Sequence, residues 1–261
     1  MVYKLIYTMY TVKKTTMRRI YFTMILLIGI IACQEESLQT PINEAETISQ
    51  VGDAKTFDVV MDERDLLDRG ITSIRNGSIS YYIGYQQVSS NNQNPILSRY
   101  DDGILTWSRT DYETSGDDSK GYGLAWDSQN NLYAVFSCTG TQGDESTDFR
   151  RFAKNGWLTS YGQGGGKKIV IIAKINVNSG DVEYATYLHG ELSNGNSNSI
   201  SVTSLDFDAE NNIIVGANAW FSPRRIDRVK MECSGDSPFD YSITFTENLS
   251  TALSATASGC Q

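Results

Sequence analysis

The feature that most constrains this chain is a strand–turn–strand segment that occurs twice, 81 residues apart. Residues 124–134 read LAWDSQNNLYA and residues 205–215 read LDFDAENNIIV, so two apolar runs flank the same polar turn in each copy. An aspartate that accepts backbone N–H groups and an asparagine that tolerates positive φ both favour a tight turn between strands. The turn positions are Asp127, Asn130, Asn131, Asp208, Asn211 and Asn212. The two aspartates could also contribute to a calcium site, but the turn accounts for both without a metal.

A second hairpin follows the first copy at residues 168–188, and related segments lie at residues 97–108 and 229–245. A further hairpin, at residues 71–85, turns at Asn76 and Gly77. These segments group into three four-stranded modules near residues 70–110, 121–190 and 203–245, within a domain that spans residues 56–261. Repeated antiparallel hairpins predict an all-β fold of four-stranded antiparallel blades, in an incomplete or small β-propeller-like array.

Three modules are fewer than the roughly four to eight blades of a closed propeller. Residues 57–67 and 246–261 could form a partial fourth blade, two protomers could share a ring, or the array could stay open. We expect an incomplete propeller that is capped by its terminal segments, because open arrays otherwise leave exposed faces and edges. The oligomeric state stays open at this point.

The motif residues resemble the bacterial β-propeller repeat known as SBBP, with its approximate pattern D-x-x-G-N-x-Y-V-x-G, D-F-P, F-V-A-K-L-D-x-x-G and W-S-T-Y-L-G-G. The matches are Asp127, Asn131, Tyr133, Asp148, Phe149, residues 172–176, residues 179–180 and residues 184–190. The chain departs from the pattern at Asn130 and Asn211, where the family has Gly, and at Arg150, where it has Pro. The resemblance covers roughly residues 70–245 and implies propeller blades. The family has no common catalytic motif, so no functional residue carries over.

The N-terminal residues resemble the signal of a bacterial lipoprotein. A basic segment starts at Met17, residues 20–31 are too short an apolar run to span a bilayer comfortably, and Ala32 stands just before Cys33. The resemblance implies that residues 1–32 are a signal peptide, with Met17 as the true start. Cys33 would then be the lipidated first residue, which anchors the protein through its acyl chains. An ordinary secretory signal with an incidental cysteine and a buried helix are the alternatives.

Residues 33–55 are polar and lack periodicity, which predicts a flexible tether. The acidic residues directly after Cys33 resemble the signal that sends Bacteroidota lipoproteins to the outer face of the outer membrane, so the expected location is that membrane. Removal of residues 1–32 takes away five basic residues and no acidic one, which moves the formal charge from −9 to −14. That charge argues against nucleic acid and anionic lipid as partners of the folded domain.

Cysteine usage fits an exported protein, because Cys138, Cys233 and Cys260 remain once Cys33 carries lipid. A disulfide between Cys233 and Cys260 would pin the C-terminus to the third module. Three free, partly buried thiols are the equally weighted alternative. There is no C-x-x-C spacing and His189 is the sole histidine, so no metal site is predicted.

The long insertion in the second module, residues 139–166, is the expected contact surface, because insertions between repeats commonly project as loops on one face. Its candidate partner contacts are Phe149, Arg150, Arg151, Phe152 and Trp157. The glycine-rich stretch at residues 162–168 misses the phosphate-loop spacing and precedes a strand, so no nucleotide or other cofactor is predicted.

With one histidine and no visible nucleophile or base, the sequence favours a non-catalytic, lipid-anchored scaffold over an enzyme. The expected ligand is a glycan, a protein or another envelope partner. The alternative is a carbohydrate-active hydrolase or lyase, whose carboxylates only the fold would bring together.

Overall fold

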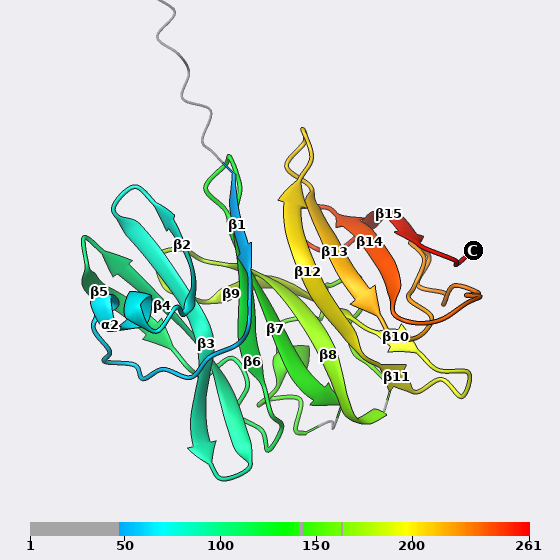
Figure 1. Cartoon of the computed structure of the whole chain (residues 1–261), viewed down its shortest axis with the longest axis horizontal. Coiled ribbons are helices and arrows are strands. Elements are labelled where there is room, and N and C mark those ends of the chain that lie inside the picture. The colour runs from blue at the N-terminus through cyan, green and yellow to red at the C-terminus, as the bar shows by residue number, and fades with distance from the viewer. Residues whose placement is uncertain (1–46, 141–142, 163) are drawn as a thin grey trace, which may run out of the picture. The chain divides into compact units, whose positions relative to one another are not determined.

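The computed structural model describes residues 47–140, 143–162 and 164–261, which form three main antiparallel β-sheets (Figure 1). Cys33, the expected signal peptide and most of the expected tether lie outside the described residues. Within the described part of the chain, no helix has the length and apolar character needed to cross a membrane.

Each sheet corresponds to one predicted module. The first sheet has the order β2 (Thr72–Asn76), β3 (Ile79–Ser89), β4 (Asn92–Asp101), β5 (Ile104–Arg109). The second has the order β1 (Ile48–Val51), β6 (Lys120–Trp126), β7 (Leu132–Gly140), β8 (Gly164–Ile175), β9 (Val182–Leu188). The third has the order β12 (Ile200–Phe207), β13 (Ile213–Ala219), β14 (Phe239–Phe245), β15 (Ala252–Ala257). A short pair, β10 (Gly190–Glu191) and β11 (Ser197–Asn198), lies between the second and third sheets in sequence.

This arrangement confirms the all-β prediction of repeated four-stranded antiparallel blades, and among the described residues no sheet closes into a barrel. The third blade differs from its predicted boundaries. Residues 229–236, expected as a strand, form only isolated bridges, and β15 supplies the fourth strand. Residues 246–261 therefore complete the third blade and do not start a fourth one. Residues 57–67 form no blade either, because they lead into α2 (Glu63–Asp68).

The repeated turns follow the predicted chemistry in both copies. The Oδ1 atom of Asp127 accepts the backbone N–H groups of Gln129 and Asn131, both at 2.8 Å. In the second copy, the Oδ1 atom of Asp208 accepts the N–H of Asn212 at 2.8 Å. The asparagines Asn130 and Asn211 have φ angles of 67° and 61°, the left-handed conformation that asparagine tolerates. The hydroxyl of Ser128 donates to Oδ1 of Asn211 at 2.8 Å, so the two turns lie side by side.

Strand β1 lies where the three sheets converge, although its residues were expected in the tether (Figure 1). It pairs with β6 from Ile48 opposite Trp126 to Val51 opposite Gly123. The hydroxyl of Ser49 in β1 donates a hydrogen bond to the carbonyl of Leu205 in the third sheet at 2.7 Å. The tether prediction is therefore wrong for residues 48–51, since they pair with the inner strand of the second blade and contact the third.

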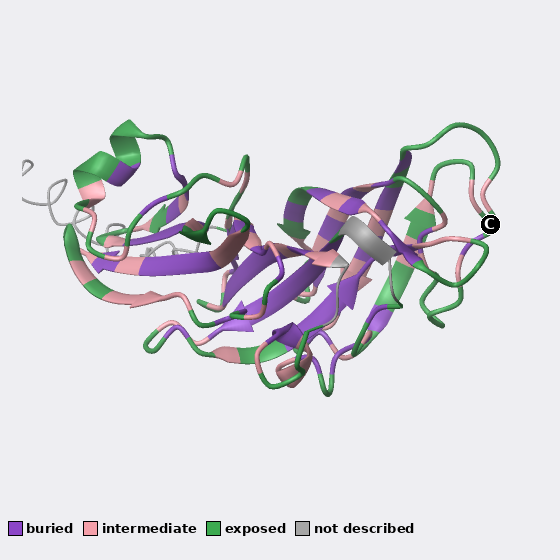
Figure 2. Ribbon diagram, turned by 90° about the horizontal axis from the view of Figure 1, so that it is seen from below, coloured by how far each residue is buried: buried purple, intermediate pink, exposed green. Residues whose placement is uncertain are grey.

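Two cores lie between neighbouring sheets, and Figure 2 shows buried residues concentrated along those strands. One core joins the first and second sheets through residues such as Ile83 and Phe136, and the other joins the second and third through residues such as Val170 and Ile243. The first two sheets approach so closely at Gly121 that a Cβ there would lie 2.2 Å from Cγ1 of Ile83. Glycine is required at that position because any side chain would clash.

The two outer faces of the array are protected differently. The outer face of the first sheet is apolar, and α2 and the segment before it cover it with Leu66 and Phe57, which pack with Tyr82, Ile96 and Tyr100. In the third sheet, the β14 residues that alternate with the core residues are polar, namely Asp240, Ser242 and Thr244, and the hydroxyl of Ser254 in β15 donates to Thr244 at 3.0 Å. A polar outer face is how terminal units of repeat proteins remain soluble.

Candidate functional site

The predicted contact residues of the insertion are largely buried, so the expectation that they project is wrong. Trp157 is 2% exposed, its ring centroid lies 5.4 Å from that of Phe245, and its Nε1–H donates to the carbonyl of Ile226 at 3.0 Å. Phe149 is fully buried, with its ring centroid 5.1 Å from that of Phe136. Such large aromatic side chains gain more from burial between sheets than from exposure.

The remaining insertion residues hold the segment to the domain. Arg150 forms an ion pair with Asp148, with Nη2 and Oδ2 2.6 Å apart. The guanidinium of Arg151 stacks over the ring of Phe152, with its Cζ 4.3 Å from the centroid, and donates to the carbonyl of Asp111. These partners are local or belong to the domain's own loops, so the insertion acts as a structural clamp.

Three carboxylates gather where the insertion meets the loop between β5 and β6. Glu113, Asp117 and Asp148 are each at most 6% exposed. Asp148 forms an ion pair with Arg150, and Oδ1 of Asp117 accepts a hydrogen bond from the hydroxyl of Thr139 at 3.1 Å. The Oε1 atom of Glu113 accepts the N–H of Ser115, while its buried Oε2 has no hydrogen-bond partner.

Burial controls the ionisation of this cluster. Desolvation raises the pKa of Asp117 to about 6, against the opposing hydrogen bond from Thr139, and the neighbouring carboxylates of Glu113 and Asp148 raise it further. Desolvation likewise raises the pKa of Glu113, and the Asp148 carboxylate adds to the shift. Raised carboxyl pKa values are typical of general acids, but structural clusters show them too. The described residues contain no group of three or more His, Cys, Asp and Glu side chains arranged to hold a metal ion.

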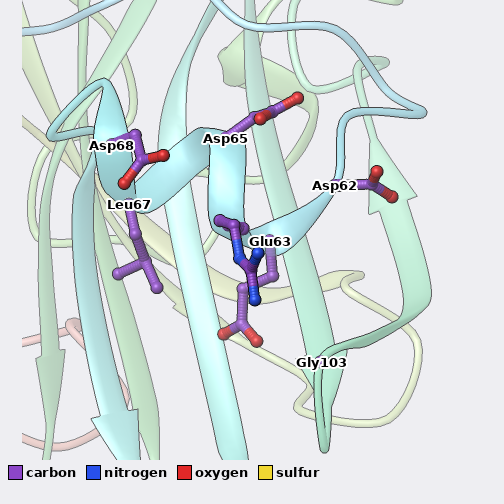
Figure 3. Close-up of a pocket in the computed structure, with 7 residues that line it drawn as sticks. Asp62, Glu63, Asp65, Leu67, Asp68 and Gly103 are labelled. Atoms are coloured by element: carbon purple, nitrogen blue, oxygen red, sulfur yellow. The ribbon is translucent and has the colours of Figure 1, made fainter.

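A second acidic region is the hollow over α2 (Figure 3), with a volume of about 530 Å³. The carboxylates of Asp62, Asp65 and Asp68 lie apart from one another in this view and do not converge on a common point. The carboxylate of Glu63 is occupied by Arg75 at 2.6 Å and by the hydroxyl of Tyr82 at 3.0 Å. The side chains of this hollow therefore do not form a binding site.

An exposed apolar and basic surface lies on the connection between β13 and β14, residues 220–238. Its exposed side chains are Trp220, Phe221, Ile226 and Val229, which are between 40% and 51% exposed. The same connection carries four basic residues, Arg224, Arg225, Arg228 and Lys230. We call residues 220–230 the basic loop. Aromatic and arginine side chains of this kind are enriched at protein interfaces.

The basic loop borders a cleft along β15, with a volume of about 580 Å³, which we call the β15 cleft. It is lined by Arg225, Ile226, Met231, Leu253, Ser254, Ala255, Thr256, Ala257, Cys260 and Gln261. At one end, a disulfide joins Cys233 to Cys260, and the backbones of Glu232 and Gln261 exchange two hydrogen bonds of 2.9 Å. The C-terminus is therefore held against the third sheet and closes that end of the cleft.

Among the described residues, the remaining cysteine and the histidine are interior. Cys138 is a buried free thiol whose pKa is raised by desolvation, so it is poorly suited to act as a nucleophile. His189 is buried, which lowers its pKa to about 4, and its Nδ1 lies 2.8 Å from the carbonyl oxygen of Gly190. At neutral pH this histidine is uncharged and occupied by the backbone.

Comparison with known proteins gave no match of this chain to a family model, a curated protein or a solved structure. Sequence reasoning placed the contact surface in the insertion and missed the basic loop. Four basic residues within residues 224–230 of a strongly acidic chain were the signal that could have indicated it.

Proposed function

We propose that this protein is a lipid-anchored scaffold of the bacterial cell envelope that binds a partner, a glycan or a protein, through the basic loop. The observation that carries the proposal is the exposure of Trp220, Phe221, Ile226 and Val229 beside several cations on a protein with a formal charge of −9. Exposed apolar side chains that gather on one loop among charged residues are typical of interaction sites.

The basic loop is held in place, which supports a role in recognition. Arg224 forms an ion pair with Glu191, and its carbonyl accepts the hydroxyl of Tyr241 at 2.7 Å. The carbonyl of Ile226 accepts the indole N–H of Trp157, and the N–H of Met231 donates to the carbonyl of Pro223 at 2.7 Å. A loop that is already ordered loses little conformational entropy on binding.

The membrane anchor is proposed from the N-terminal residues, which lie outside the described part of the chain. Cys33→Ser should abolish incorporation of a palmitate analogue during growth and release the protein from the membrane fraction. Label that persists in the serine variant would show that Cys33 is not the lipidated residue.

The partner surface can be tested by placing a photoreactive phenylalanine analogue at Phe221 in the lipidated protein in cells. An adduct of defined mass should form at this position and not at Val60, a more exposed apolar residue on the segment before α2. Equal adducts at both positions, or none at Phe221 and none at Ile226, would contradict the proposal.

The hydrolase or lyase alternative is favoured by one observation, the raised pKa values of Glu113 and Asp117 in one cluster. Their low exposure counts against it, because a general acid must reach the bond that is cleaved. Release of reducing ends from envelope glycans by the protein, lost in Glu113→Gln, would establish this alternative and overturn the scaffold assignment.

A further inference from the structure

The outer edge of the second sheet is covered by another segment of the chain, whereas the outer edge of the third sheet is open. The insertion covers the edge of β9, because the N–H of Tyr187 donates to the carbonyl of Leu158 at 3.1 Å. The contact is so close that a Cβ on Gly156 would lie 2.2 Å from the carbonyl oxygen of Ala185. The edge of β15, by contrast, opens on the β15 cleft.

The pairing register shows which backbone groups of β15 face the cleft. The N–H of Ser258 donates to the carbonyl of Asp240 at 2.9 Å, and hydrogen-bonded pairs alternate along antiparallel strands. Thr256, opposite Ser242, therefore bonds to β14, whereas Ala255, opposite Ile243, turns its N–H and C=O outward. The strand from residue 252 to residue 257 contains no Pro and no charged residue of the kind that usually protects an edge.

The charge of the loop beside the cleft favours an occupant of the opposite charge. Arg225 lines the cleft and is half-exposed, and Arg228 and Lys230 follow it on the same wall-forming loop. Arg225 pairs with Asp227, so the loop retains a net positive charge from Arg228 and Lys230. Acidic groups of a partner would be repelled by the rest of this acidic protein and attracted to the basic loop.

We propose that the β15 cleft accepts an extended, acidic segment of a partner protein, which pairs with β15 as a fifth strand of the third sheet. This assignment rests on the proposed function and names the class of partner. Main-chain hydrogen bonds to Ala255 would supply affinity, while the basic loop and the apolar side chain of Ile226 would supply selectivity. Small side chains on the β15 wall of the cleft, such as those of Ala255 and Thr256, allow the close backbone approach that strand addition needs.

The test uses the mature protein and a synthetic eight-residue peptide that alternates Val or Thr with Glu, labelled for fluorescence anisotropy. Saturable binding is expected, and a peptide with Lys in place of Glu should bind at least about tenfold more weakly. Amide hydrogen exchange, measured by NMR, provides the direct readout. Peptide should slow exchange at Ala255 and leave Thr256 unchanged, because the Thr256 amide is already bonded to β14.

Two variants locate the site. Ala255→Pro removes an outward N–H that β14 does not use, so it should weaken the peptide about tenfold or more while leaving the melting transition cooperative. Arg225→Glu combined with Lys230→Glu should reverse the preference between the Glu and Lys peptides. Arg64→Glu, which reverses an exposed charge on α2, is the control and should leave the affinities for both peptides unchanged.

The outcomes separate this inference from the proposed function. No peptide binding, or binding without protection at Ala255, would overturn strand addition, while the adduct at Phe221 in cells would still support the scaffold. A protein that dimerises with protection at Ala255 in the absence of peptide would show that a second copy fills the cleft, and would also overturn the inference.

Discussion

The main-chain N–H of Trp157 donates a 2.8 Å hydrogen bond to the carbonyl oxygen of Leu249. Trp157 belongs to the insertion of the second blade, and Leu249 lies in the turn between β14 and β15 of the third. Leu249 is fully buried and has a φ of 58°, an uncommon conformation for a leucine. The insertion therefore joins the second blade to the third through the turn that connects β14 and β15.

Trp157→Ala should lower the free energy of unfolding by about 3 to 5 kcal/mol, because it removes a buried ring between two sheets and its hydrogen bond to Ile226. Urea unfolding of the two proteins measures the change. Trp220→Ala is the matched control, since it deletes the same side chain where it is 42% exposed, and should cost well under half as much. An equal loss of unfolding free energy in the two variants would contradict the role of the insertion as a structural clamp between blades.

The difference between these two tryptophans shows how far the sequence could lead. The blade hairpins could be predicted because their turns depend on local chemistry, an aspartate that binds N–H groups two and four residues ahead and an asparagine at positive φ. The burial of Trp157 and the exposure of Trp220 could not, because each depends on contacts with distant segments. Trp157 contacts Phe245 and Ile226, which lie in the third blade and its basic loop.

The same limit explains the errors at the chain ends. Residues 48–51 have too few residues to show a strand pattern, and they form β1 only because β6 offers its inner edge. The fourth strand of the third blade was misplaced for a similar reason. Residues 252–257 read ALSATA, which has few of the β-branched and aromatic residues that are typical of strands. They form a strand because they pair with β14.

The disulfide between Cys233 and Cys260 should stabilise the protein by about 2 to 4 kcal/mol, because it closes a loop with a sequence separation of 27. The measurement compares urea unfolding of the protein with that of a variant carrying both Cys233→Ser and Cys260→Ser. Both proteins also carry Cys138→Ala, which removes the buried thiol as a source of exchange. An unchanged unfolding midpoint would show that the backbone pairing of Glu232 with Gln261 suffices to hold the C-terminus.

Asp117→Asn should stabilise the protein at neutral pH. Burial raises the folded-state pKa of Asp117 from 3.8 to about 6, so between these values the folded state holds a proton that the unfolded state has released. Stability therefore falls as pH rises from about 4 to 6, and the cost of the buried charge is fully present above that range. The asparagine variant should lack this part of the slope and gain about 1 to 2 kcal/mol at pH 7.

Asp227→Asn controls for removal of one negative charge. Its hydrogen bond to Arg225 lowers the pKa of Asp227, which is the opposite sign, so this variant should gain no stability at pH 7. The check is the free energy of unfolding of all three proteins between pH 4 and pH 8. A slope that persists in Asp117→Asn would assign the pH dependence to another carboxyl, with Glu113 the first to examine.

The last prediction concerns the open ends of the array. Leu66 covers the apolar outer face of the first sheet, and the outward-facing residues of β14 in the third sheet are polar, so neither face requires a second copy. Light scattering should therefore find the mature protein monomeric. Leu66→Asp should expose that apolar face and produce concentration-dependent association, whereas Leu67→Asp, at a neighbouring position that is 53% exposed, should remain a monomer. A stable dimer of the unaltered protein that forms without protection at Ala255 would instead mean that two arrays share one ring, and that α2 does not act as a cap.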